Sequence, residues 1–168
     1  MENEIVNRVA NSKLVTIDLE DFYPIGERKE IDISQWLYEG IVLREKEFRS
    51  AIKEQDWSEY ANCYVALNCT TDAIIPGWAY MLVALELSAI AKKVVVGSLD
   101  NLESIIFAEI LQNLNPSPFA DKSVIIKGCA YKPIPQNAYV LLAQRLQPVV
   151  KSIMYGEACS SVPLFRKK

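Results

Sequence analysis

Three cysteines and two carboxylates are the residues of this chain whose types and positions could do chemistry together. Cys69, Cys129 and Cys159 each follow an apolar, strand-like run, and Asp72 and Glu157 stand near two of them. Thiolate sulfur and carboxylate oxygen are ligands that zinc and iron accept. We therefore predict a metal site formed by Cys69, Cys129, Cys159, Asp72 and Glu157, with zinc or iron as its cofactor if it holds one.

The absence of histidine narrows this chemistry. None of the 168 residues is a histidine. A Ser-His-Asp triad, a Cys-His dyad, an HExxH zinc site and a histidine general base are therefore excluded within this chain. Any metal site must use thiolate, carboxylate or backbone ligands. The sequence has no CxxC pair, and each cysteine is also explained as a buried residue or a loop thiol, because cysteine is among the most buried residue types.

The four cysteines do not share one interpretation. Cys69 precedes a predicted helix, whose partial positive charge would stabilise a thiolate. Cys63 stands at the entering end of its strand, where we expect a small buried side chain. Cys159 could be a nucleophile with Glu157 as its base, but a carboxylate of ordinary pKa deprotonates a thiol poorly. Whether the chain is an enzyme stays open.

A regular alternation after residue 60 predicts the elements that position these cysteines. Apolar runs predict buried strands at 64–67, 94–97, 123–127 and 152–155, with helices between them over 73–91, 100–114 and 135–146. This alternation predicts an α/β fold of three layers, with a mostly parallel sheet of four core strands and crossover helices. Because the carboxyl ends of parallel strands share one edge, Cys69, Cys129 and Cys159 come to the same edge of that sheet. With the strand order second-first-third-fourth, the order reverses between the strands that end in Cys69 and Cys129, where such sheets bind ligands.

The first 60 residues are mixed in character and predict an N-terminal α+β extension. We expect a helix over 2–10, a strand over 14–19, a helical turn capped by Asp32 and an amphipathic helix over 45–55. The length of the chain predicts a single domain over 1–168, in which the extension 1–60 packs on the α/β core 61–168. No internal repeat is apparent.

Charge and composition set expectations for partners and location. Eighteen Lys and Arg stand against 21 Asp and Glu, with a net charge of −3 and no basic stripe, so we expect no nucleic acid partner. The first residues lack the pattern of a signal peptide, which predicts a cytoplasmic protein. The apolar stretch 73–91 contains Pro76 and Gly77, and a buried core helix explains it, so we expect no membrane association.

Several short motifs together resemble one family. They are Asp72-Ala73-Ile74-Ile75-Pro76 with Trp78-Ala79-Tyr80, Lys127-Gly128-Cys129, and Gly156-Glu157 with Cys159-Ser160 and Val162-Pro163. With these motifs the chain resembles, over nearly its whole length, an uncharacterised bacterial family catalogued as a domain of unknown function, number 2480 in that series. The resemblance brings no catalytic residue or cofactor. It implies an accessory role near iron–sulfur cluster assembly.

Two functions of different classes follow from these observations. The first is a cytoplasmic protein with a cysteine-lined site at the carboxyl edge of its sheet, handling metal or sulfur in support of iron–sulfur cluster assembly. The alternative is a non-catalytic binding or scaffold protein that acts as a homo-oligomer or with a protein partner. The absence of a complete catalytic set favours the alternative, which requires a large apolar surface for the partner.

Overall fold

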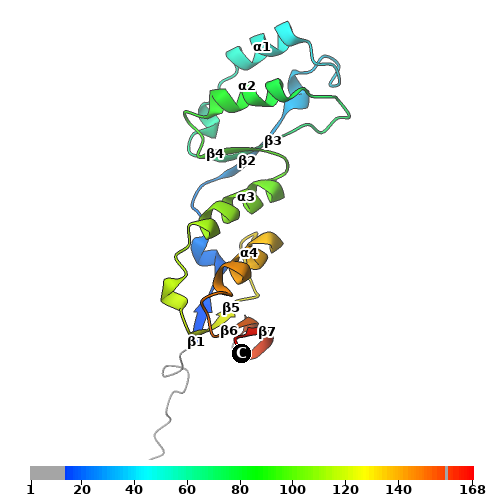
Figure 1. Ribbon diagram of the computed structural model, residues 1–168. Coiled ribbons are helices and arrows are strands. Elements are labelled where there is room, and N and C mark those ends of the chain that lie inside the picture. Colours follow the sequence, from blue (N-terminus) through cyan, green and yellow to red (C-terminus); the bar gives the residue numbers. More distant parts are fainter. Residues whose placement is uncertain (1–13, 158) are drawn as a thin grey trace, which may run out of the picture. The chain divides into compact units, whose positions relative to one another are not determined.

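The computed structural model describes residues 14–157 and 159–168, which form two compact units (Figure 1). Unit 1 contains residues 14–23 and those from 106 onward, and unit 2 contains residues 24–105. No division falls at residue 60, because residues 24–60 build one unit with residues 61–105. The single domain stays a prediction, since compactness does not show whether the units unfold together. The helix expected over 2–10 lies outside the described residues.

Unit 2 is a parallel three-stranded sheet with a helix on each crossover. Its elements are β2 (Arg28–Asp32), α1 (Glu45–Glu54), β3 (Tyr64–Asn68), α2 (Gly77–Leu87) and β4 (Lys93–Val96), with 3-10 turns at Ile33–Trp36 and Ser58–Tyr60. The sheet order is β2-β3-β4. Both α1 and α2 lie on one side of the sheet (Figure 1), as right-handed crossovers in one direction require. Phe48 and Leu87 are fully buried in the core between the helices and the sheet.

The beginning of α3 (Leu99–Gln112) belongs to unit 2 and carries its only buried charge among the described residues. Glu103 accepts a hydrogen bond from Nε of Arg28 in β2 at 2.6 Å. Side chains alternate along β2, so Arg28 points away from the face on which Ile31 meets α1 and α2. The ion pair therefore ties the first turns of α3 to the second face of the sheet.

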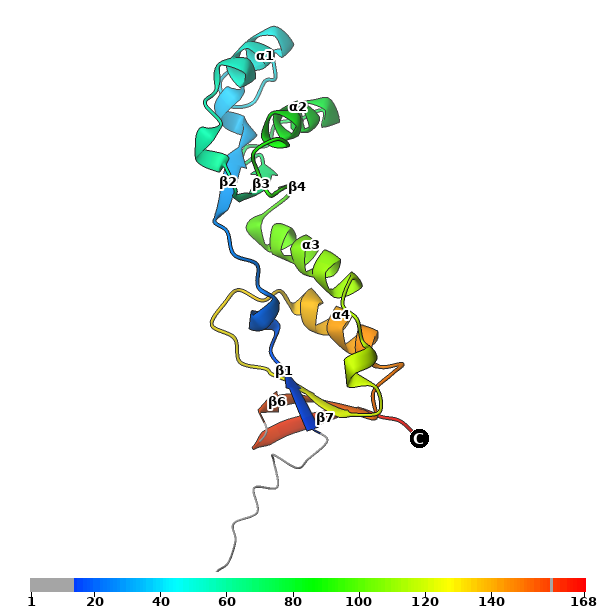
Figure 2. The ribbon, with the colours of Figure 1, turned by 90° about the vertical axis from the view of Figure 1, so that its left-hand side faces the viewer.

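Unit 1 has the same kind of sheet with one strand added. Its elements are β1 (Leu14–Ile17), the rest of α3, β5 (Ser123–Ile126), α4 (Gln136–Leu146), β6 (Ser152–Glu157) and β7 (Ser160–Arg166), with 3-10 turns at Leu19–Phe22 and Ser117–Phe119. The order is β1-β5-β6-β7, in which only β7 is antiparallel to its neighbour. The view in Figure 2 shows α4 over one face of this sheet. Phe107 and Leu142 are fully buried there.

The two units repeat one plan, and from α1 onward equivalent residues lie 59 positions apart. Tyr64 pairs with Lys93 in unit 2 as Ser123 pairs with Ser152 in unit 1. The shared positions in the two cores are Phe48 and Phe107, Ala79 and Ala138, and Leu87 and Leu146, all with no exposed surface. The expectation of no internal repeat is therefore wrong for the fold.

Two backbone features reproduce the repeat in detail. Asn62 and Asp121 both have positive φ, 59° and 55°. Each then donates its backbone N–H to a carbonyl before the last parallel strand, Asn62 to Ile90 and Asp121 to Val149, both at 2.8 Å. Because non-glycine residues seldom adopt positive φ, two such turns at equivalent positions show that the same local structure is built twice.

The first strands of the two units follow each other directly, so the units are nested. Asp18 directly follows β1, and Asp32 is the last residue of β2. Each carboxylate accepts from the backbone N–H two residues further on and so caps a 3-10 turn. The whole of unit 2 then follows before unit 1 continues with α3. The chain thus leaves unit 1 after its first strand, completes unit 2, and returns.

The α/β class and a mostly parallel four-stranded sheet are confirmed. The assumed strand order is wrong, because the strands at 64–68 and 93–96 belong to one sheet and those at 123–126 and 152–157 to the other. The helix expected over 73–91 is shorter, Gly77–Leu87. Among the helices of the described residues, none combines the length and the apolar character needed to cross a bilayer.

Candidate functional site

The predicted site residues divide between the two units. Cys69 and Asp72 follow β3 in unit 2, whereas Cys129 follows β5 and Cys159 lies between β6 and β7 in unit 1. The prediction of one cysteine-lined edge depended on all four core strands sharing one sheet. That premise is wrong, so the topology no longer brings Cys69 to the edge that carries Cys129 and Cys159.

Cys69 and Asp72 also lack the helix end that was expected beside them. The helix begins at Gly77, several residues later, and its N-cap Pro76 offers no side-chain hydrogen bond. Asp72 is exposed and does not cap the helix. The half-buried Cys69 thiol instead lies 3.4 Å from Thr71 Oγ1. The predicted stabilisation of a Cys69 thiolate by the helix is therefore wrong.

In unit 1, three of the predicted ligands do share one edge, because β5 and β6 are parallel neighbours. Cys129 and Cys159 are exposed, and Glu157 is half-buried at the end of β6. Over residues 14–157 and 159–168, however, no three Cys, Asp or Glu side chains lie close enough to hold one metal ion. The metal role of Cys69, Cys129, Cys159, Asp72 and Glu157 stays a prediction.

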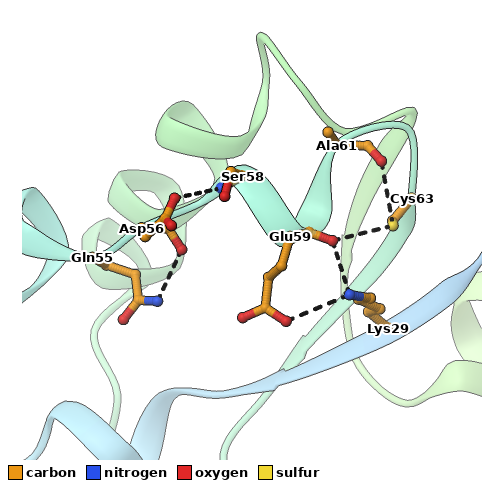
Figure 3. A network of polar contacts seen from close by, with 7 residues as sticks. All are labelled: Lys29, Gln55, Asp56, Ser58, Glu59, Ala61 and Cys63. Carbon is orange, nitrogen blue, oxygen red and sulfur yellow. Dashed lines mark hydrogen bonds and ion pairs between the residues drawn. The ribbon is translucent and has the colours of Figure 1, made fainter.

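Cys63 is buried in the core of unit 2, as expected, and its sulfur lies near two backbone carbonyls (Figure 3). Its Sγ donates to the carbonyls of Ala61 and Glu59 at 3.5 and 3.7 Å. The same Glu59 carbonyl accepts from Lys29 Nζ at 2.8 Å (Figure 3). Cys63 therefore helps to hold the turn before β3 and offers no accessible thiol.

The carboxyl edge of the unit 1 sheet is rich in charges that are paired with each other. Asp18 Oδ2 accepts from Lys127 Nζ at 2.6 Å. Burial opposes ionisation of Asp18, but hydrogen bonds from Lys127 and from the Glu20 backbone outweigh it and lower the pKa of the carboxyl. Glu20 in turn accepts from the backbone N–H groups of Tyr131 and Lys132. These groups hold the loop after β5 in place.

The equivalent edge of unit 2 is organised around Asp32. Its carboxylate accepts from the N–H and hydroxyl of Ser34, at 2.9 and 2.6 Å, and from both groups of Thr70. Burial raises the pKa of this carboxyl, but these hydrogen bonds prevail and bring it to about 2. A carboxylate with so low a pKa is a poor proton acceptor at neutral pH. Asp32 therefore serves to hold the turns at Ser34 and Thr70 in place.

Each unit has a tyrosine at the equivalent position near the carboxyl edge of its sheet. Tyr80 in α2 and Tyr139 in α4 occupy equivalent positions. Burial is the largest cause that raises the pKa of both phenols, and a nearby carboxylate adds to it, Asp32 for Tyr80 and Asp18 for Tyr139. Both phenols stay protonated at neutral pH. They can donate a hydrogen bond but cannot serve as bases.

An exposed apolar surface lies along α2 and β4, and we call it the α2–β4 surface. Met81, Leu85 and Val96 are 66%, 70% and 56% exposed. Met81 and Leu85 of α2 and the edge of β4 at Lys93 and Val94 line a groove of about 550 Å³. Large exposed apolar patches mark interaction sites in soluble proteins. The α2–β4 surface is therefore a candidate interaction surface of unit 2.

A signal for this surface was present in the sequence. The segment of α2 is apolar around its whole circumference, with Glu86 as its only charged residue. A helix of that kind is buried on all sides in its functional state. We attributed the pattern to burial in the core, but only one side of α2 is buried, at Ala79, Val83 and Leu87.

Fold and surface together define an α/β protein of two repeated, nested units, one of which presents an exposed apolar surface. The chain belongs to the family described as Protein of unknown function (DUF2480), which it matches over residues 3–167. Neither the curated proteins nor the solved structures contain a match to the chain.

Proposed function

We propose that this chain is a non-catalytic binding protein whose partner docks on the α2–β4 surface. The observation that carries the proposal is the exposure of Met81 and Leu85 on a helix with no polar face. Burying two such side chains against a partner stabilises a complex by about 1.5–3 kcal/mol each.

The repeat supplies an internal comparison for this surface. The position equivalent to Leu85 in α4 is Gln144, so the outward face of α4 is more polar there. Two helices with the same role in the fold therefore differ on the side that points away from their own core. The difference is explained if the α2 side is covered by a partner and the α4 side is not.

Site-specific photo-crosslinking in living cells tests this function. A photoreactive phenylalanine analogue is placed at Met81, and the matched control carries it at Val140, the equivalent and 53% exposed position of α4. We expect a crosslinked product of defined size from position 81 and little from position 140. No product at position 81, or equal products at both positions, would contradict the proposal.

Metal or sulfur handling, with a link to iron–sulfur cluster assembly, stays the second hypothesis. It now depends on Cys129, Cys159 and Glu157 of unit 1, which share a sheet edge. Metal analysis of the native protein and of the Cys129→Ser variant tests it. Protein free of zinc and iron, and unchanged by the substitution, would exclude the metal site.

A further inference from the structure

The two units differ at one edge of their sheets. In unit 1 the antiparallel strand β7 covers the outer edge of β6, with pairs from Ser152–Arg166 to Glu157–Ser160. In unit 2 the equivalent strand β4 is the last of its sheet and has no neighbour on that side among the described residues. The chain turns at Gly97 into α3 instead of forming a hairpin. The repeat thus shows what covers this edge in one unit and leaves it open in the other.

After its first residue, Lys93, the open edge of β4 carries no charged residue, proline or bulge over Val94–Val96. Charged residues, proline and bulges are the usual protection of an edge strand. β2, at the opposite edge of the same sheet, carries Arg28, Lys29 and Glu30. β7 contains Pro163, and its ladder to β6 has a register shift. In β4, Val94–Val96 follow Lys93 without any such residue.

The backbone groups that face the open side belong to alternate residues of β4. The N–H of Gly97 donates to Leu67 of β3 at 2.8 Å, so the groups of Val95 also face β3 by the alternation of a parallel ladder. The N–H and C=O groups of Val94 and Val96 then point away from β3. Two residues with unpaired main-chain groups make a short template for another strand.

We propose that β4 pairs in antiparallel fashion with β4 of a second copy of this chain. This inference rests on the proposed function and names its partner. A two-fold axis at Val95 places Val94 opposite Val96 of the second copy, which satisfies the open groups of both strands. Lys93 then lies opposite the second copy's Gly97, so the lysines of the two copies stay apart. The apolar Met81 and Leu85 line the same groove as β4, and they meet their counterparts across the axis.

A second copy fits better than an unrelated extended segment. The exposed residues of α2 stand beside the edge strand, so an added strand alone would leave the helix side chains uncovered. A second copy supplies both a strand, β4, and an apolar helix, α2, which lie beside each other as they do in the first copy. Self-complementary association of this kind is typical of two-fold dimers.

The mass of the full-length protein in solution, measured by light scattering, tests the pairing. We expect a dimer that is weakened about thirtyfold by Val96→Pro, because proline removes one outward N–H per copy and leaves the ladder to β3 intact. Val96→Thr keeps the N–H and is the matched control, with the dimer retained. A monomer at all concentrations, or a dimer unchanged by Val96→Pro, would overturn the inference.

A crosslinking experiment decides the case even where Val96→Pro fails to fold. In a chain with Cys69, Cys129 and Cys159 replaced by serine, Val95→Cys should form a disulfide between copies when a mild oxidant such as copper phenanthroline is added, because the paired Cα atoms lie about 4.5 Å apart. Val96→Cys in the same background should not, since it faces Val94. No disulfide from Val95→Cys contradicts the pairing. A monomeric protein that still crosslinks another protein at Met81 overturns this inference and leaves the proposed function standing.

Discussion

Removal of the Glu103 carboxylate should destabilise unit 2 by about 3 kcal/mol. Its side chain is 6% exposed and that of Arg28 is 13% exposed, so Glu103→Ala leaves a guanidinium largely out of water. Losing one partner of a buried pair costs about 3–5 kcal/mol. We expect the lower end, because Arg28 keeps hydrogen bonds to the carbonyls of Pro24 and Gly26 and its contact with the Tyr64 ring.

Urea unfolding followed by tryptophan fluorescence measures this loss, because all three tryptophans of the chain lie in unit 2: Trp36, Trp57 and Trp78. Glu59→Ala is the matched control. It removes the exposed ion pair with Lys29 and should cost about 0–1 kcal/mol. A loss below about 1 kcal/mol for Glu103→Ala would refute the reasoning, since the pair would then behave as a solvated one.

Two further predictions concern acid sensitivity and the coupling of the units. The pKa of Asp32 is lowered to about 2, so its stabilisation is full above pH 3.8 and is lost as the pH falls through about 2. With allowance for solvent screening, the ionised Asp32 stabilises the fold by about 1–2 kcal/mol. Asp32→Asn should therefore make the urea midpoint decline less steeply between pH 4 and 2. An unchanged slope would contradict this role of Asp32. Phe48→Ala and Phe107→Ala each remove a fully buried ring and should cost about 3–5 kcal/mol. If the chain is one cooperative domain, Phe107→Ala also lowers the midpoint seen by tryptophan fluorescence; an unmoved midpoint shows that the units unfold separately.

The elements of the repeated core could be predicted from sequence because their apolar residues are continuous. The run Val124–Ile126, for example, is buried in the middle of its sheet and predicts a strand without help from its surroundings. Edge strands lack this signal. β2 reads Arg-Lys-Glu-Ile-Asp and has no continuous apolar run. β7 contains Pro163, which argues against a central strand.

The pairing of strands could not be predicted, because it depends on contacts between distant segments. β1 and β2 are adjacent in sequence, yet one joins β5 and the other joins β3. The repeat was hidden for a related reason. Equivalent positions such as Ile52 and Leu111 share burial but not residue type. The predicted metal site assumed that all four core strands share one sheet. Local sequence patterns do not show which strands pair, so this assumption could not be checked from the sequence.

The nested order of the units has a consequence for synthesis on the ribosome. Unit 2 is continuous in the chain, and its first strand pairs over a short separation, Arg28 with Tyr64. In unit 1, Leu14 of β1 pairs with Ser123 of β5, which is synthesised much later. Closing a longer loop costs more entropy and slows folding. Unit 2 is therefore expected to fold first during elongation, while β1 stays without its partner strand until β5 has emerged.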